Sequence, residues 1–135
     1  NSIRFNDSNA AIEVEGAIGF NGEVVFSNTV ESSSSISAAG GFFDTSDARV
    51  KANVKEIDAS DADKVKLVEF DRTDKEHHGY GVIAQELEKV YPEMVNTDSE
   101  GFKSVNYNEL AMVKIKYLED KVARLEALVG RLLAE

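Results

Sequence analysis

Apolar and polar residues alternate in residues 1–30, and turn-forming residues separate the alternating pairs. The apolar pairs are Ile3 and Phe5, Ile12 and Val14, Ile18 and Phe20, and Val24 and Phe26. A period of two predicts short β-strands, and Asn21-Gly22 is the strongest hairpin signal in the chain. Strands this short cannot close a core alone. We therefore expect other copies of the same segment, or the rest of a larger β domain, to cover them.

Residues 31–45 lack periodicity and are rich in small side chains, which predicts a loop or linker. Phe42 and Phe43 are bulky for a linker, so we expect its end to dock on another part of the molecule. An exposed segment of this kind is also a place where a chain is readily cleaved.

Residues 46–107 predict a small mixed α/β core. Val50, Val54 and Ile57 have helical spacing, which predicts a helix over 48–57. The remaining expected elements are a turn over 58–63, strands over 65–70 and 80–83 around a polar turn, a short helix over 84–91 that Pro92 ends, and a hairpin of 94–95 and 102–107 around 97–101.

The clearest pattern lies in a helix predicted over residues 108–133. Its apolar residues step alternately by four and three, and they form the seam of a coiled coil: Ala111, Ile115, Leu118, Val122, Leu125, Val129 and Leu132. Lys114 and Lys121 occupy heptad position g, and Glu119 and Glu126 occupy position e. In parallel helices each g lysine would meet the e glutamate five residues on in its neighbour, which sets the register.

The number of helices in this coiled coil is not fixed by the heptads. Branched residues at a with Leu at d favour a dimer. Leu128 at g and Leu133 at e widen the apolar stripe and favour three or more helices. The alternative is a single amphipathic helix that packs on its own domain.

Composition narrows the function classes. The net charge is −10, from 25 acidic and 15 basic residues, which argues against a nucleic-acid or anionic-membrane surface. No apolar run approaches a membrane span, and the absence of Cys excludes disulfides and thiolate zinc sites. The chain does not begin with Met, so we expect a fragment or a processed product.

Ser46 and Lys51 lie five residues apart, where the chain changes from strand-like to charged and helical. A serine beside a lysine suggests a nucleophile with an amine base. Lysine acts as a base only when neutral, and burial or a nearby cation such as Arg49 favours that form, whereas Asp47 would oppose it unless it points away. The alternative is that Thr45, Ser46 and Asp47 simply cap the following helix.

Other polar clusters carry weaker signals. His77 and His78 are adjacent, so in a strand they point to opposite faces and cannot chelate one metal together. Asp58, Asp61 and Asp63 lack the glycine and terminal glutamate of a calcium loop, so we expect a solvated loop. Gln85, Glu86 and Glu88 suit the start of a helix. We expect no metal and no cofactor.

Four segments together resemble a known family. They are SDARVKANV, GYGVIAQELEKVYPEMV, SVNYNEL and the final heptad helix. In combination they are similar to the C-terminal intramolecular chaperone domain of phage tailspikes and tail fibres, which has relatives in endosialidase, phage neck appendages and myelin regulatory factor. The resemblance runs from Ser46 to about Leu132. Val50 and Val54 stand where Leu and Ile are usual, and both changes are conservative.

The resemblance implies an α+β fold with short N-terminal strands, a small mixed core and a long helix in a trimeric parallel coiled coil. It implies a homotrimer in which Ser46 is the nucleophile, Lys51 is the base and Thr45–Ser46 is the bond cut. Attack by Ser46 on the carbonyl before it would be an N-to-O acyl shift followed by ester hydrolysis, which is a single-turnover event. Residues 1–45 would be the end of the β-rich fibre, and residues 46–135 the chaperone.

These roles imply two locations. Residues 1–45 would remain in the virion tail fibre or spike, where a host cell-surface receptor is a possible partner. The chaperone domain would act in the bacterial cytoplasm during assembly and then be released. Two alternatives are a non-catalytic trimeric clamp at the fibre tip, and a receptor-binding tip that uses residues 1–45 or the loop over 71–79.

Overall fold

The computed structural model describes residues 14–135. The chain divides into two units, one ending at Ser46 and the other spanning Asp47–Glu135, and each is considered by itself. In the described part of the first unit, residues 14–46, every side chain is exposed and no helix or strand is present.

The strands predicted around Ile18–Phe20 and Val24–Phe26 are therefore wrong for the single chain, and Asn21-Gly22 forms a bend without a ladder. A strand needs a partner for its backbone groups and a cover for its apolar face, and residues 14–46 supply neither. The side chain of Phe26 is 66 % exposed, for example. The pair Ile3 and Phe5 lies outside the described residues, as does Ile12.

The linker prediction is confirmed for residues 31–45 as irregular backbone. The backbone of Gly41 has φ 88, and its N–H closes a turn on the carbonyl of Ala38. Phe42 and Phe43 are 74 % and 94 % exposed, and the docking expected of them stays a prediction.

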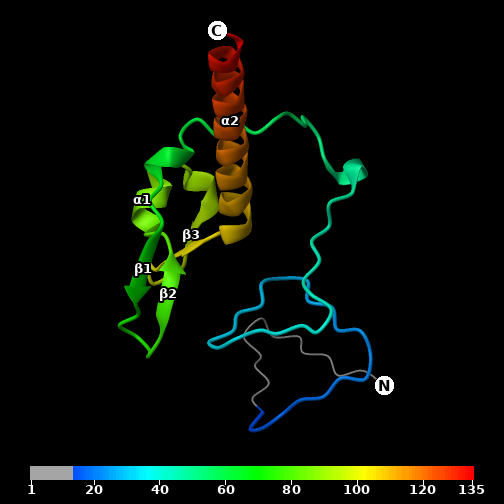
Figure 1. The fold of residues 1–135 in the computed structure, drawn as a ribbon. Coiled ribbons are helices and arrows are strands. Elements are labelled where there is room, and N and C mark those ends of the chain that lie inside the picture. The colour runs from blue at the N-terminus through cyan, green and yellow to red at the C-terminus, as the bar shows by residue number, and fades with distance from the viewer. Residues whose placement is uncertain (1–13) are drawn as a thin grey trace. The chain divides into compact units, whose positions relative to one another are not determined.

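The second unit is α+β, as predicted (Figure 1). Its elements, in order, are the 3-10 helices η1 (Ala48–Val50) and η2 (Ala62–Lys64), strands β1 (Val68–Asp71) and β2 (His78–Gly81), helix α1 (Ala84–Glu88), 3-10 helix η3 (Pro92–Met94), strands β3 (Val95–Thr97) and β4 (Lys103–Val105), and helix α2 (Tyr107–Ala134). The small elements gather around the N-terminal half of α2 (Figure 1).

The strands of this unit pair as two antiparallel hairpins, which confirms both predicted strand–turn–strand patterns. In β1–β2, Phe70 pairs with Gly79, and in β3–β4, Val95 pairs with Val105. The second turn closes on Asp98, whose carboxylate accepts hydrogen bonds from the backbone N–H groups of Glu100 and Phe102, both at 2.9 Å.

The helix predicted over 48–57 is wrong beyond its first turn. Only η1 forms, and Asn53 then adopts a left-handed backbone with φ 55. The apolar side chains that suggested a helix have no surface to pack on, because Val50 and Val54 are 68 % and 80 % exposed. Most helical stability in proteins comes from packing of one face, and β-branched residues add little propensity of their own.

The core of the second unit is small, and α2 closes it. The buried residues are Ala59, Ala62, Val65, Val82, Leu87, Met94, Leu110 and Val113. Leu110 and Val113 come from the first two turns of α2, and Tyr117 packs against the core one turn later. The helix begins at Asn106, whose side chain accepts a hydrogen bond from the backbone N–H of Glu109 at 3.2 Å, as an N-cap does.

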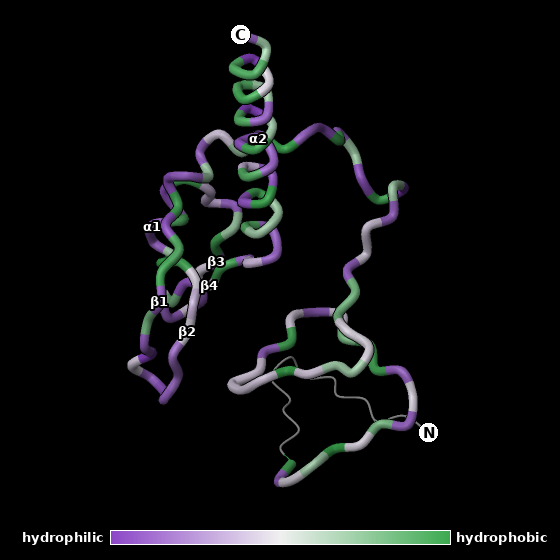
Figure 2. Tube along the Cα trace, in the orientation of Figure 1, coloured by the Kyte–Doolittle hydropathy of each residue, from purple (hydrophilic) through white to green (hydrophobic). Residues whose placement is uncertain are grey.

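Helix α2 confirms the helix predicted over 108–133 and places its two faces in different surroundings. Hydrophobic and hydrophilic residues alternate along it (Figure 2). Leu110, Val113 and Tyr117 face the core of the chain itself. From Lys121 onward every side chain is exposed, and this half of the helix stands clear of the smaller elements (Figure 1).

Candidate functional site

Ser46 and Lys51 flank the single turn of η1. Ser46 precedes the N-cap residue Asp47, and Lys51 is the C-cap residue, with its backbone N–H donating to the carbonyl of Ala48 at 3.2 Å. Thr45, Ser46 and Lys51 are all exposed. Ser46 closes the first unit and Lys51 lies in the second, so a joint role for the two side chains stays a prediction.

Asp47 is the N-cap of the turn. Its carboxylate accepts a hydrogen bond from the backbone N–H of Arg49 at 2.8 Å. The same carboxylate accepts two more from the Arg49 guanidinium, at 2.9 Å and 2.8 Å. The capping role that the sequence suggested for Thr45, Ser46 and Asp47 is confirmed for Asp47.

The bidentate pair also settles how Arg49 and Asp47 act on their surroundings. The guanidinium of Arg49 lowers the pKa of Asp47, and Asp47 in return raises the pKa of Arg49. Each charge lies against the other, so the pair presents little net charge to its neighbours. Arg49 is thus not the isolated cation that would help to neutralise a nearby lysine.

The segment that follows Lys51 contacts α2 through an ion pair. Lys116 Nζ donates to Glu56 Oε1 at 3.2 Å and to Asp120 Oδ1 at 2.8 Å. Glu56 is 87 % exposed at its side chain, so this ion pair is a weak surface contact. It nevertheless joins the segment around η1 to the long helix.

Lys114 makes a second and more buried attachment. Its Nζ donates to the carbonyl oxygens of Ala62 at 2.6 Å and Val65 at 2.5 Å. These carbonyls end η2, where a cation is favoured. Desolvation by burial lowers the pKa of Lys114. Two of its three N–H donors are therefore used within its own chain, and the pairing of Lys114 with Glu119 of a neighbouring helix stays a prediction.

Tyr107 connects the first hairpin to the start of α2. Its hydroxyl oxygen accepts a hydrogen bond from the backbone N–H of Val82 at 3.2 Å. The Tyr107 ring fills the space beside Gly81, and the Phe70 ring fills the space beside Gly79. No functional role is predicted for these residues from the sequence, although GYG carries Gly79 and Gly81 and SVNYNEL carries Tyr107.

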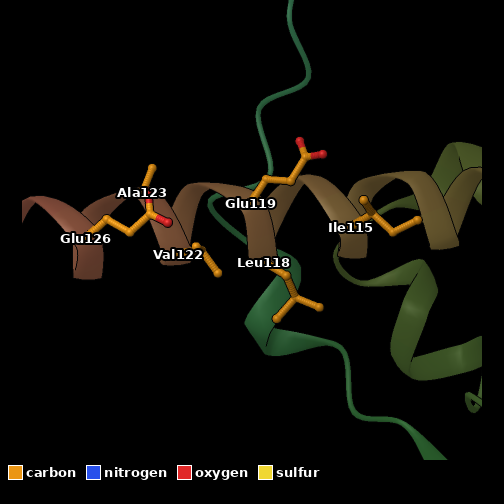
Figure 3. Close-up of a pocket in the computed structure, with 6 residues that line it drawn as sticks. All are labelled: Ile115, Leu118, Glu119, Val122, Ala123 and Glu126. Carbon is orange, nitrogen blue, oxygen red and sulfur yellow. The ribbon is translucent and has the colours of Figure 1, made fainter.

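The seam predicted from the heptads is exposed in the single chain. All seven of its residues are exposed, and the values from Ile115 to Leu132 lie near one half, with Leu118 at 57 % and Val122 at 52 %. Leu118 and Val122 project from the same side of α2 and line a shallow apolar hollow with Ile115, Glu119, Ala123 and Glu126 (Figure 3). The alternative that α2 packs this face on its own domain is wrong.

The remaining polar clusters show no metal site in the part of the chain that the structure describes. His78 Nδ1 lies 2.8 Å from Asp71 Oδ1, and the His78 ring meets Tyr80 edge-on. Asp58 accepts from the backbone N–H of Ser60 at 3.0 Å, and Asp61 binds Lys64. Between residues 14 and 135 no helix combines the length and apolar character that a membrane crossing needs.

A family model described as "Chaperone of endosialidase", the peptidase S74 family, matches residues 46–96. A search of curated proteins finds no match to the chain. The family supports an intramolecular chaperone role with an association to phage tails, and its peptidase designation implies a self-cleaving peptidase-type domain. The matched region holds η1, both strands of the first hairpin, α1 and η3. The resemblance to the chaperone of endosialidase drawn from the sequence is therefore confirmed over residues 46–96.

Proposed function

We propose that residues 46–135 assemble three copies of the chain in parallel through α2, align the upstream β segment of residues 1–45, and then cut the Thr45–Ser46 bond. The product would be a fibre or spike segment freed from its chaperone in the bacterial cytoplasm and retained in the virion. The family match supplies the chaperone and peptidase character of the domain.

The observation that carries this proposal is the exposed seam of α2. The helix already buries Leu110 and Val113 against its own core, so its second apolar stripe is not needed to fold the domain. A stripe of branched and Leu side chains at heptad spacing matches the interface of a coiled coil. Parallel association would bring the segments that precede the domain close together and raise their effective concentration.

Charge patterning supports the parallel register. Lys114 shares its ammonium with the carbonyls of Ala62 and Val65, so Lys121 is the g lysine with more freedom to meet a neighbouring helix. Lys121 lies over its own Tyr117 ring, 5.8 Å from the centroid, on the exposed half of α2. Its partner in the parallel register would be Glu126 of the next chain.

The proposed chemistry is an N-to-O acyl shift. Ser46 Oγ attacks the carbonyl carbon of Thr45, and its proton passes to the neutral amine of Lys51. The C–N bond breaks as the Lys51 ammonium returns a proton to the departing Ser46 nitrogen, which leaves an ester. Water then hydrolyses the ester to a Thr45 carboxylate and a free Ser46 hydroxyl.

The test is expression of the chain with its natural upstream sequence, followed by denaturing electrophoresis and mass spectrometry of the products. Two fragments that join at Thr45–Ser46 support the proposal. A stable full-length band from an assembled wild-type protein would instead support a non-catalytic clamp at the fibre tip. Binding of the mature tip to bacterial cells would test the receptor-binding alternative separately.

A further inference from the structure

We propose that Met112 of each chain seats in an apolar hollow on the first hairpin of a neighbouring copy. The hollow is the surface lined by Leu67, Val68, Glu69, Tyr80, Gly81 and Tyr107, and it is called the hairpin hollow below. This inference rests on the proposed parallel assembly. It adds a contact between the first hairpin of one chain and the helix α2 of the next.

The hairpin hollow is open and apolar. It has a volume of about 540 Å³. Leu67 and Tyr80 are 70 % and 77 % exposed, and Tyr107 is 47 % exposed. Single exposed apolar residues are ordinary on protein surfaces, but several around one hollow mark an interaction site.

The heptad register places one residue of a neighbouring chain opposite this hollow. Tyr107 lies one heptad before Lys114 and therefore also occupies position g. In a parallel coiled coil a g residue meets the e residue five positions on in the next helix. For Tyr107 that residue is Met112, which is 59 % exposed.

The pairing repeats with matched chemistry along α2. The four g-to-e pairs between neighbouring chains would be Tyr107 with Met112, Lys114 with Glu119, Lys121 with Glu126, and Leu128 with Leu133. The outer pairs are apolar and the inner pairs are oppositely charged, so one register satisfies all four. A shift by one heptad would place Tyr107 opposite Glu119 and Lys114 opposite Glu126, and would leave Leu128 without an apolar partner.

The structure also fixes the hairpin to this flank of the helix. The Tyr107 hydroxyl holds the backbone of Val82, and Gly81 leaves the ring room to lie against the hairpin. A neighbour's residue that meets Tyr107 on this side would enter the hollow that Tyr80 and Leu67 also line. Methionine suits this site because its thioether is flexible and packs well on aromatic rings.

The contact would set the register at the N-terminal end of the coiled coil. Lys114, the next g residue, donates to carbonyls of its own chain and contributes less to pairing between chains. Alignment of the helices near their N-terminal ends would then depend on the apolar contact of Met112. The charged pair of Lys121 and Glu126 would align the distal half.

A cross-linking experiment tests the contact directly, because the chain contains no Cys. Chains carrying Met112→Cys and chains carrying Tyr80→Cys are refolded together, oxidised, and run on a non-reducing gel. The expected product is a covalent heterodimer joined through the two introduced sulfurs, identified by mass spectrometry. Each variant alone serves as the control for random oxidation.

A second mixture separates the failure of this inference from failure of the assembly. Chains with Lys121→Cys and chains with Glu126→Cys report the parallel register further along α2. If this pair cross-links and the Met112–Tyr80 pair does not, Met112 does not occupy the hairpin hollow and the inference is overturned. Monomers by light scattering would overturn the assembly itself and the inference with it.

A thermodynamic measurement supports the same test. Met112→Ser should raise the concentration at which the assembly dissociates by about tenfold, since it removes one buried Met contact per chain. Ala127→Ser at the outward f position is the matched control and should leave that concentration unchanged. Equal behaviour of the two variants would overturn the inference.

Discussion

A Cβ atom at Gly81 would lie 2.1 Å from the hydroxyl oxygen of Tyr107. This is far inside van der Waals contact, so the glycine in β2 and the first residue of α2 fit only as a pair. The contact holds the first hairpin against the start of α2. It therefore fixes the position of the hairpin relative to the heptad seam.

Gly81→Ala should therefore destabilise the second unit by about 1–3 kcal/mol, because the added methyl forces the Tyr107 ring out of its place. Urea unfolding followed by circular dichroism measures the change. Gly130→Ala is the matched control, since nothing lies within 4 Å of a Cβ at Gly130. That control should stabilise the helix by about 0.8–1 kcal/mol, and a loss of stability in both variants would contradict the explanation.

Lys114→Met should destabilise the domain by about 1–3 kcal/mol, because it removes the donor to the carbonyls of Ala62 and Val65. Lys121→Met removes the same charge one heptad later on an exposed turn, and it should leave monomer unfolding almost unchanged. The comparison is made by urea unfolding below the concentration at which chains associate. Equal effects would mean that the buried attachment of Lys114 contributes little.

Ser46→Ala and Lys51→Ala should each abolish cleavage at Thr45–Ser46 while leaving the assembly intact. A nucleophile and its base act as a unit, so either loss removes the reaction. Intact mass measures cleavage, and light scattering measures assembly. Ser60→Ala and Lys55→Ala are controls of the same residue types on the same segment. Wild-type cleavage in either of the first two variants would reject the dyad.

Val122→Asp should yield monomers, because each copy would bring an unpaired carboxylate into the middle of the seam. Cleavage should fall with assembly. Ala127→Asp carries the same charge at the outward f position and should still assemble. Light scattering and electrophoresis give the two readouts, and a monomer that cleaves normally would show that one chain completes the reaction alone.

The cleaved β product should remain assembled in hot detergent and should not refold once melted. Its persistence would then reflect a high barrier to unfolding after the template has gone. The uncleaved Ser46→Ala protein keeps the template and should recover its oligomer on cooling, because tethering lowers the cost of non-local strand pairing. Equal recovery of both proteins would favour the clamp over the chaperone.

Local patterns in the sequence predicted the hairpins and the helices well where their own residues carried the signal. Pro92 after α1, Asp98 at the second turn and the heptads of α2 each specify structure within a few residues. The exposed seam could also be anticipated, because its spacing is that of a coiled coil.

The sequence misled where an element depends on partners that residue spacing does not reveal. Val50 and Val54 have helical spacing, but no surface of the chain lies against them, so the helix stops after one turn. The alternation around Ile18 and Val24 forms no ladder within one chain, because strands need neighbours. A buried role for Lys114 was also not predictable, since its carbonyl partners lie some fifty residues away in sequence.

The two faces of α2 would separate the folding of one chain from the association of several chains. Burial of Leu110 and Val113 occurs within one chain, so its rate does not depend on how many chains are present. In the proposed assembly, the face with Leu118 and Val122 would be covered only when chains associate, and the rate of that step would rise steeply with concentration. A cut that waits for collision would begin after a delay that shortens as chains accumulate. Because of this delay, cleavage would depend on the concentration of chains. An isolated chain would keep its β segment, and chains at high concentration would release theirs.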